Sequence, residues 1–254
     1  MITVSEQATR HEPQKKFAVF DIDGTLIRWQ LYHAITDKLG KLGYLPADSL
    51  ERLHTMRMEW KNRNSIDAYH HYEAEMVAVF QEALSNIPIE AYSTAVTAVF
   101  DTYKDQVYTY TRELIAHLKQ KGYLIFAISG SPQDVLQKIG EHYGFDAVVG
   151  PRYEQKDGSF TGQISLTHTR KGEILQELVA EHNASWQDSI AVGDSPSDIA
   201  MLELVEKPVA FNPTGDLYEL ALEKKWPIIV ERKNVIYNLH PQGDQYVLQE
   251  KSRG

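Results

Sequence analysis

The chain has 254 residues, of which 43% are hydrophobic, so it contains enough apolar material for a sizeable core. Its 26 Lys and Arg residues are outnumbered by 35 Asp and Glu residues, and the formal net charge of −9 argues against a nonspecific nucleic-acid binder. Cysteine is absent, which excludes disulfides, thiolate nucleophiles and cysteine metal ligands and favours a cytoplasmic location.

The N-terminal residues 1–16 are polar throughout and contain no apolar stretch of the kind that signal peptides carry. No later apolar run approaches the length that a membrane-spanning helix needs. We therefore expect a flexible tail over residues 1–16 and no membrane partner.

The first predicted element is a short buried strand, "FAVFD", after which the apolar spacing changes from that of a strand to that of a helix. Four segments carry the helical spacing, and glycine, proline or polar turns separate them: 31–42, 48–61, 66–84 and 89–104. These segments predict a small helical bundle inserted after the first strand.

Beyond residue 108, predicted helices alternate with short apolar strands, and one hairpin, "YEQKDGSFTGQI", lies among them. This alternation is typical of α/β proteins with a parallel sheet. Because the first strand precedes the bundle, the bundle interrupts the unit that forms the sheet. The predicted fold is α/β, a Rossmann-like parallel sheet with an inserted helical cap. Its expected units are a core of residues 17–30 and 109–232, a cap of residues 31–108 and a peripheral tail of residues 233–254.

Polar residues follow three of the predicted strands, in the stretches "FDIDGT", "ISGSP" and "VGDSPSD". The carboxyl ends of parallel strands line one crevice, so these loops are expected to share a site. Asp21 and Asp23 project to the same face if the chain stays extended, and a divalent cation would relieve their repulsion. Mg²⁺ prefers such oxygen ligands; Asp194 supplies a further carboxylate, with Asp198 nearby.

The "SGSP" stretch has the features of an anion site at the start of a helix. Ser131 suits the N-cap position and Pro132 the first helical position, which leaves backbone N–H groups free for an anion. Lys171, at the start of a later predicted helix, would add a positive charge to the same anion. Each motif alone also fits a turn or a solvated helix, whereas their combination favours a shared site.

In their order along the chain, "DIDGT", "SGS", Lys171 in "RKGEIL" and "GDSPSD" resemble the signatures of haloacid dehalogenase superfamily phosphatases. The resemblance covers residues 17–230. The helical insert after the first signature and the "DGSFTGQI" hairpin are similar to the subgroup around phosphoserine phosphatase. The resemblance therefore implies a hydrolase with a Rossmann-like core and a cap.

The resemblance also implies a role for each signature residue. Asp21 would be the nucleophile that forms an aspartyl-phosphate, and Asp23 would be the general acid and base. The implied phosphoryl-binding groups are Ser129, the Gly130 amide and Lys171. The implied Mg²⁺ site consists of Asp21, Asp23 through its backbone carbonyl, Asp194 and, in support, Asp198.

The resemblance implies that the helical insert contacts the leaving group of the substrate. Phosphoserine phosphatases usually have Ser at the position of Gly24 and an acidic residue near the position of Gln30, so phosphoserine specificity is in doubt here. The candidate substrate-binding residues are Gln30 and, for a substrate carboxylate, Arg57 and Arg63.

The predicted function is magnesium-dependent hydrolysis of a small phosphorylated metabolite through an aspartyl-phosphate. Two alternatives stay open at this point. The same residues would serve a phosphotransferase that uses an alcohol acceptor, which product analysis with added alcohols would distinguish. A catalytically silent phosphate-binding or scaffold protein would keep the fold and show no magnesium-dependent turnover.

Overall fold

The computed structural model describes residues 14–65 and 67–249, so most of the expected N-terminal tail lies outside the described residues. Within the described chain, no helix is both long and apolar enough to cross a bilayer. The described α-helices are α1 Leu31–Lys41, α2 Ala47–Lys61, α3 Ala68–Leu84, α4 Ile89–Tyr103, α5 Thr109–Gln120, α6 Gln133–Tyr143, α7 Lys171–Glu181, α8 Ile199–Leu202 and α9 Gly215–Lys224. Ile66, where the third helix was expected to begin, also lies outside the described residues.

An eight-stranded sheet forms the centre of the described chain, in the order β10-β9-β8-β7-β6-β1-β2-β3. The strands are β1 Lys15–Phe20, β2 Leu124–Ile128, β3 Ala147–Val149, β6 Ala184–Gly193, β7 Lys207–Phe211, β8 Ile228–Arg232, β9 Val235–Gln242 and β10 Gln245–Gln249. The six strands from β3 across to β8 pair in parallel, which confirms the predicted parallel α/β core. A separate hairpin joins β4 Arg152–Lys156 to β5 Ser159–Ser165.

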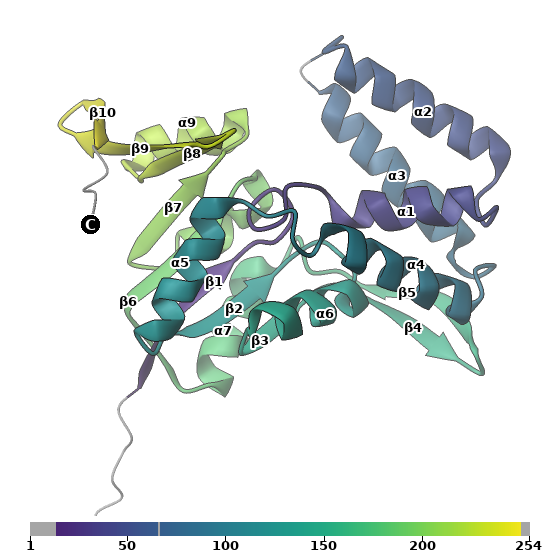
Figure 1. Ribbon diagram of the computed structural model, residues 1–254, viewed down its shortest axis with the longest axis horizontal. Helices are drawn as coiled ribbons and strands as arrows, with labels where there is room; N and C mark the ends of the chain where they lie inside the picture. The colour runs from purple at the N-terminus through teal and green to yellow at the C-terminus, as the bar shows by residue number, and fades with distance from the viewer. Residues whose placement is uncertain (1–13, 66, 250–254) are drawn as a thin grey trace, which may run out of the picture.

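The central strand β1 is apolar on both faces because helices cover both sides of the sheet (Figure 1). Ala18 and Phe20 belong to the core on the side of α5 and α6. Phe17 and Val19 belong to the core on the side of α7, α8 and α9. The buried apolar residues 17–20 of β1 therefore lead directly to the carboxyl end of this strand.

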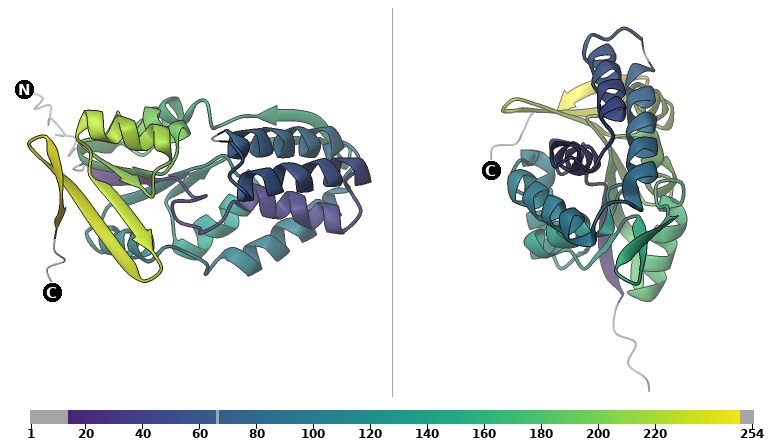
Figure 2. Two further views of the ribbon diagram at one scale, coloured as in Figure 1. Left: turned by 90° about the horizontal axis from the view of Figure 1, so that it is seen from above. Right: turned by 90° about the vertical axis from the view of Figure 1, so that its right-hand side faces the viewer.

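Helices α1 to α4 follow β1 and lie together at one end of the sheet (Figure 2). We call this group the helical insert. Its buried residues share one core with α5 and α6, and the Tyr92 hydroxyl on α4 donates to Asp134 on α6 at 3.1 Å. The insert is thus packed on the same side of the sheet as α6.

The C-terminal segment is part of the sheet, although its polarity predicts a peripheral tail. Strand β9 pairs antiparallel with β8, and β10 pairs antiparallel with β9. The Tyr246 hydroxyl donates to the carbonyls of Ala221 and Trp226, which fixes β10 against the end of α9. These strands are half-buried or exposed, so their sequence is polar although they extend the sheet.

Candidate active site

The chain leaves β1 at two buried aspartates that have different partners. The Asp21 N–H donates to the Val192 carbonyl of β6 at 2.9 Å, which holds the start of the loop beside that strand. The Asp23 carboxylate accepts from the Leu31 N–H at 2.6 Å and from the Ser129 hydroxyl at 2.8 Å. Asp23 therefore links the end of β1 to the start of α1 and to the end of β2.

The loop after β6 is built around the buried Asp198. One carboxylate oxygen of Asp198 accepts from the N–H groups of Asp194 and Ser195, each at 3.0 Å. This loop approaches β6 so closely that a Cβ on Gly193 would lie 2.5 Å from the Cβ of Asp198. Glycine is thus required at position 193 for Asp198 to occupy this place.

Lys171, the first residue of α7, joins the two loops. Its ammonium lies 2.7 Å from Asp21 Oδ1 and 2.6 Å from Asp198 Oδ1, and the lysine side chain is only 2% exposed. A lysine is buried this deeply only when its charge is paired. Burial alone would lower the pKa of Lys171, but the carboxylates of Asp198 and Asp21 outweigh it and raise that pKa above its ordinary value.

Burial is the main cause of the raised pKa values of three aspartates in the site, Asp21, Asp23 and Asp194. It raises the pKa of Asp21 to about 7, although Lys171 pulls in the opposite direction. Burial also raises the pKa of Asp23, despite the hydrogen bond from the Leu31 N–H. The pKa of Asp194 is raised well above its ordinary value by burial and then by the charge of Asp21. The site therefore holds more acid than its single lysine can neutralise.

Oxygen atoms of Asp21, Asp194 and Asp198 all lie within 4.8 Å of one another, as a shared cation would require. Both oxygens of Asp198 are engaged, one by Lys171 and the other by backbone N–H groups. Oδ2 of Asp21 and Oδ2 of Asp194 have no hydrogen-bond donor among the described residues. The donor set thus fits a hard divalent cation, with Asp21 and Asp194 as its ligands and Asp198 as the group that positions them.

The loop after β2 lies on the other side of Asp23. The Ser129 hydroxyl donates to Asp23 and accepts from the Ser131 N–H at 3.1 Å. The exposed Gly130 lies between these two serines, and the Thr167 hydroxyl donates to the Ser129 carbonyl at 2.6 Å. Ser129 and Gly130 are therefore next to the acidic cluster, in a turn that is held from both sides.

The three substrate candidates from the sequence lie in different places. Gln30 is half-buried at the start of α1, next to the Leu31 N–H that binds Asp23. Arg57 donates from Nη1 to Asp37 at 3.0 Å and lies over the Trp29 ring at 5.7 Å, so a carboxylate already pairs with its charge, while its buried Nε has no partner among the described residues. Arg63 is exposed in the turn after α2. The structure brings only Gln30 close to the aspartates.

Several contacts of the site were not predicted by the sequence analysis. Thr25 donates to Asp194 at 3.3 Å, and the Ser131 hydroxyl accepts from the Tyr32 N–H at 3.0 Å. On α3, burial raises the pKa of Tyr69 and of Glu73, and the negative charge of Asp23 adds to both changes. Helical spacing could have placed Tyr69 and Glu73 on one face, but not against the end of β1.

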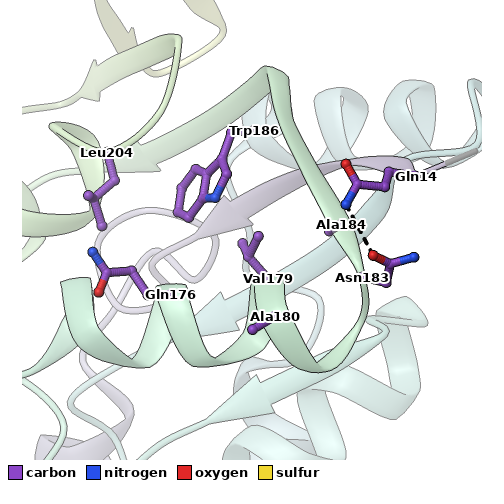
Figure 3. Close-up of a pocket in the computed structure, with 8 residues that line it drawn as sticks. All are labelled: Gln14, Gln176, Val179, Ala180, Asn183, Ala184, Trp186 and Leu204. Atoms are coloured by element: carbon purple, nitrogen blue, oxygen red, sulfur yellow. Dashed lines mark hydrogen bonds between the residues drawn. The ribbon is translucent and has the colours of Figure 1, made fainter.

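A surface groove of about 540 Å³ between α7 and β6 contains none of these groups (Figure 3). Its apolar lining consists of Val179, Ala180, Ala184, Trp186 and Leu204. The Gln14 amide at its rim donates to the Asn183 side chain at 3.0 Å. The acidic cluster at the strand ends remains the candidate active site.

The fold and the cluster together are typical of α/β enzymes, which bind their ligands at the carboxyl ends of parallel strands, here those of β1, β2 and β6. The family of haloacid dehalogenase-like hydrolases matches residues 18–203, and the chain belongs to this family. The resemblance inferred from the sequence is thereby confirmed.

Two curated relatives cover nearly the full length of the chain. A phosphoserine phosphatase of Methanocaldococcus jannaschii is 25% identical over 88% of this chain and 96% of its own. A histidinol-phosphatase of Neisseria meningitidis serogroup C is 26% identical over 85% of this chain and 98% of its own. The solved structure of a phospho-aspartyl intermediate analogue of phosphoserine phosphatase matches with a TM-score of 0.61 and 25% identity, over 87% of this chain and 96% of that one. Family and relatives confirm the prediction of a phosphatase.

Proposed function

We propose that the protein hydrolyses a small phosphomonoester in a magnesium-dependent reaction that passes through an aspartyl-phosphate on Asp21. The observation that carries this proposal is the buried Asp21 carboxylate, held by the Lys171 ammonium at 2.7 Å, with a second buried carboxylate two residues later. The relative trapped as a phospho-aspartyl analogue supports the same intermediate.

A Mg²⁺ ion would be held by Asp21, Asp194 and the backbone carbonyl of Asp23, with Asp198 in support, and would supply positive charge against the phosphate. Lys171, Ser129 and the Gly130 amide would bind the phosphate oxygens. Because Asp198 and Asp21 both accept from Lys171, the ammonium is already oriented before substrate arrives. Such preorganised charge supplies much of the catalysis in phosphoryl transfer.

In the first step, an oxygen of Asp21 attacks phosphorus, and the bond from phosphorus to the leaving alkoxide breaks. Asp23 gives its proton to the alkoxide oxygen. Its raised pKa, caused by burial, keeps that proton available. The products of this step are the free alcohol and phosphorylated Asp21.

In the second step, water attacks the phosphorus of the aspartyl-phosphate. The Asp23 carboxylate, deprotonated by the first step, takes the proton from that water. The bond between phosphorus and the Asp21 oxygen then breaks, which releases inorganic phosphate and restores both aspartates. One residue thus acts as acid and then as base.

The helical insert would act as a cap over this chemistry. Residues 17–30 and 109–232 would form the catalytic core and residues 31–108 the cap. The core joins the cap near Asp23, whose carboxylate binds the first N–H of α1. Movement of α1 would therefore shift the Asp23 carboxyl group. Closure would exclude bulk water while phosphorus is attacked.

The test replaces Asp21 with Asn and measures p-nitrophenyl phosphate hydrolysis with and without Mg²⁺. Asp21→Asn should lower turnover at least about 10⁴-fold because the nucleophile is lost, whereas Asp23→Asn should lower it by about 10²–10⁴-fold. Intact-mass spectrometry after an acid quench should show one phosphoryl group on wild type and none on Asp21→Asn.

Asp157→Asn is the matched control, because Asp157 is an exposed hairpin residue with φ of 50°, a conformation that Asn tolerates well. It should keep wild-type turnover. Undiminished magnesium-dependent turnover by Asp21→Asn would refute the proposed nucleophile.

A further inference from the structure

One face of α3 packs against α1, the helix whose first N–H binds Asp23. Tyr69, Glu73, Met76 and Phe80 have the spacing of a single helical face. Met76 and Phe80 are fully buried, and the Phe80 ring lies 5.2 Å from the ring of Tyr32. The Tyr32 N–H in turn donates to Ser131 in the loop after β2. This face is therefore tied to the phosphate-binding loop.

Glu73 is the acidic member of this face, one turn before the buried Met76. The Tyr69 ring, one turn on the other side of Glu73, lies 6.3 Å from the His33 ring of α1 and 5.0 Å from the Trp60 ring of α2. Glu73 is half-buried among these elements. It therefore lies on the inner surface of the insert.

The Glu73 carboxylate makes no hydrogen bond or ion pair within the described part of the chain, whereas Glu75 on the same helix is paired with Arg52 at 3.0 Å. Burial raises the pKa of Glu73; His70 opposes this change, and the negative charge of Asp23 adds to it. A half-buried carboxylate without a partner destabilises the free protein unless a cation reaches it.

The same face carries no cationic side chain that would pair with a carboxylate, since its polar members are Tyr69 and Glu73. Helix α3 contains no lysine or arginine. Arg57 is engaged by Asp37, and Arg63 is exposed in the turn after α2. An anionic leaving group would thus meet uncompensated negative charge, whereas a cationic one would neutralise it.

We propose that Glu73 binds the leaving group of the substrate, and that this substrate is a phosphomonoester whose alcohol carries a protonated nitrogen and no carboxylate. This inference rests on the proposed phosphatase function. The carboxylate of Glu73 accepts a hydrogen bond from the ammonium or imidazolium while the phosphate is held at Asp21. Glu73 is a specificity-determining residue of the insert.

The experiment compares kcat/KM for four phosphate esters with the full chain and Mg²⁺. Phosphoethanolamine and L-histidinol phosphate carry a small and a larger cation, glycerol 3-phosphate is uncharged in its alcohol, and O-phosphoserine adds a carboxylate. Wild type should favour one or both cationic esters over the other two by about tenfold or more, because a hydrogen bond to a charged group contributes about ten- to hundredfold.

Glu73→Gln should reduce this preference about ten- to hundredfold, mainly through a higher KM for the cationic ester, because the contact is made in both ground and transition states. Glu73→Lys should shift the preference toward O-phosphoserine. Glu82→Gln, an exposed residue on the same helix, is the matched control and should keep the wild-type preference. The melting temperature of Glu73→Gln should stay equal or rise, since an unpaired charge is removed.

Preference of the wild type for O-phosphoserine or glycerol 3-phosphate, or an unchanged preference in Glu73→Gln, would overturn the inference. An equal loss on all four esters with a lower melting temperature would also overturn it, because that pattern indicates a structural role. Hydrolysis of p-nitrophenyl phosphate that depends on Asp21 separates these outcomes from failure of the phosphatase proposal itself.

Discussion

The two sides of the candidate active site hold their charges in different ways. At the strand ends, Lys171 is bound by two carboxylates, and Asp198 accepts from two backbone N–H groups and the lysine. On the inner face of α3, the Glu73 carboxylate has no partner among the described residues. The strand-end side is a connected ionic network, whereas the α3 side presents one unpaired carboxylate next to aromatic side chains.

This difference suggests that the strand-end network carries out the reaction and that the insert selects the substrate. A connected network fixes geometry, so removing Lys171, its one cation, should harm folding and turnover together. An unpartnered group contributes little to folding, so removing it should alter the choice of substrate alone. The chemistry would therefore be shared with relatives that use the same core, while the insert would determine which phosphate ester is accepted.

The largest effect is expected for Lys171→Met, which removes the positive charge from the network and keeps an apolar side chain of similar length. Breaking a buried ion pair typically costs about 3–5 kcal/mol, and losing one electrostatic donor about 10²–10³-fold in turnover. Urea unfolding in the presence of a chelator should show the lower stability. This loss should shrink on acidification, because protonation neutralises the carboxylates that Lys171 no longer pairs.

The control for this variant is Lys207→Met, which removes an exposed lysine that is also paired with a carboxylate, that of Asp188. Exposed pairs contribute less than about 1 kcal/mol, so stability and turnover should stay near wild type. Equal stability of the two variants would mean that the strand-end network is no more tightly coupled than the surface.

A smaller change, Gly193→Ala, tests whether the network depends on close packing. The new methyl group would lie 2.5 Å from the Cβ of Asp198, so the loop must move. Overpacking of this kind costs about 1–3 kcal/mol, and a shift of about 1 Å at catalytic groups costs about 10²-fold in rate. Thermal unfolding and p-nitrophenyl phosphate turnover measure the two effects.

Gly215→Ala provides the reference, because an added Cβ at Gly215 meets no atom within 4 Å. It should change stability by no more than about 0.5 kcal/mol and leave turnover intact. If Gly193→Ala behaves in the same way, the loop that carries Asp198 is more adaptable than its contacts indicate.

The strand-end side of the site was also the part that could be predicted from sequence. Asp21 and Asp23 follow directly from an apolar strand, so their place at the sheet edge depends on local sequence alone. The burial of Lys171 could not be predicted in this way, because an isolated helix-start lysine looks solvated and its two partners come from distant loops. Its position at a helix start suggested only a charge near the anion, and the resemblance to a family implied that it binds the phosphoryl group.

The insert and the C-terminal segment show what local patterns leave open. Four helices could be predicted from apolar spacing, but the element that each face covers is decided by packing between distant segments, so Glu73 was not identified. The segment after Arg232 is polar because β9 and β10 are largely half-buried or exposed, and their pairing with the edge of β8 carries no strong apolar signal.

His33 packs inside the insert, with its ring 5.2 Å from that of Tyr72. Burial, and then the charge of Arg57, lowers the pKa of His33 from 6.5 to about 4. The unfolded chain therefore binds more protons between these values, so stability falls as pH decreases through this range. Between pH 7 and pH 4.5, His33 should account for about 2 kcal/mol of lost stability.

Urea unfolding at both pH values checks this expectation in His33→Gln, whose own difference between pH 7 and pH 4.5 should be smaller by that amount. His71→Gln replaces an exposed histidine of the same insert and should keep the wild-type difference. Because the network at the strand ends is present in all three proteins, its protonation cancels in the comparison. A wild-type pH dependence in His33→Gln would show that the insert does not carry this acid sensitivity, and that acid unfolding begins in the network around Lys171.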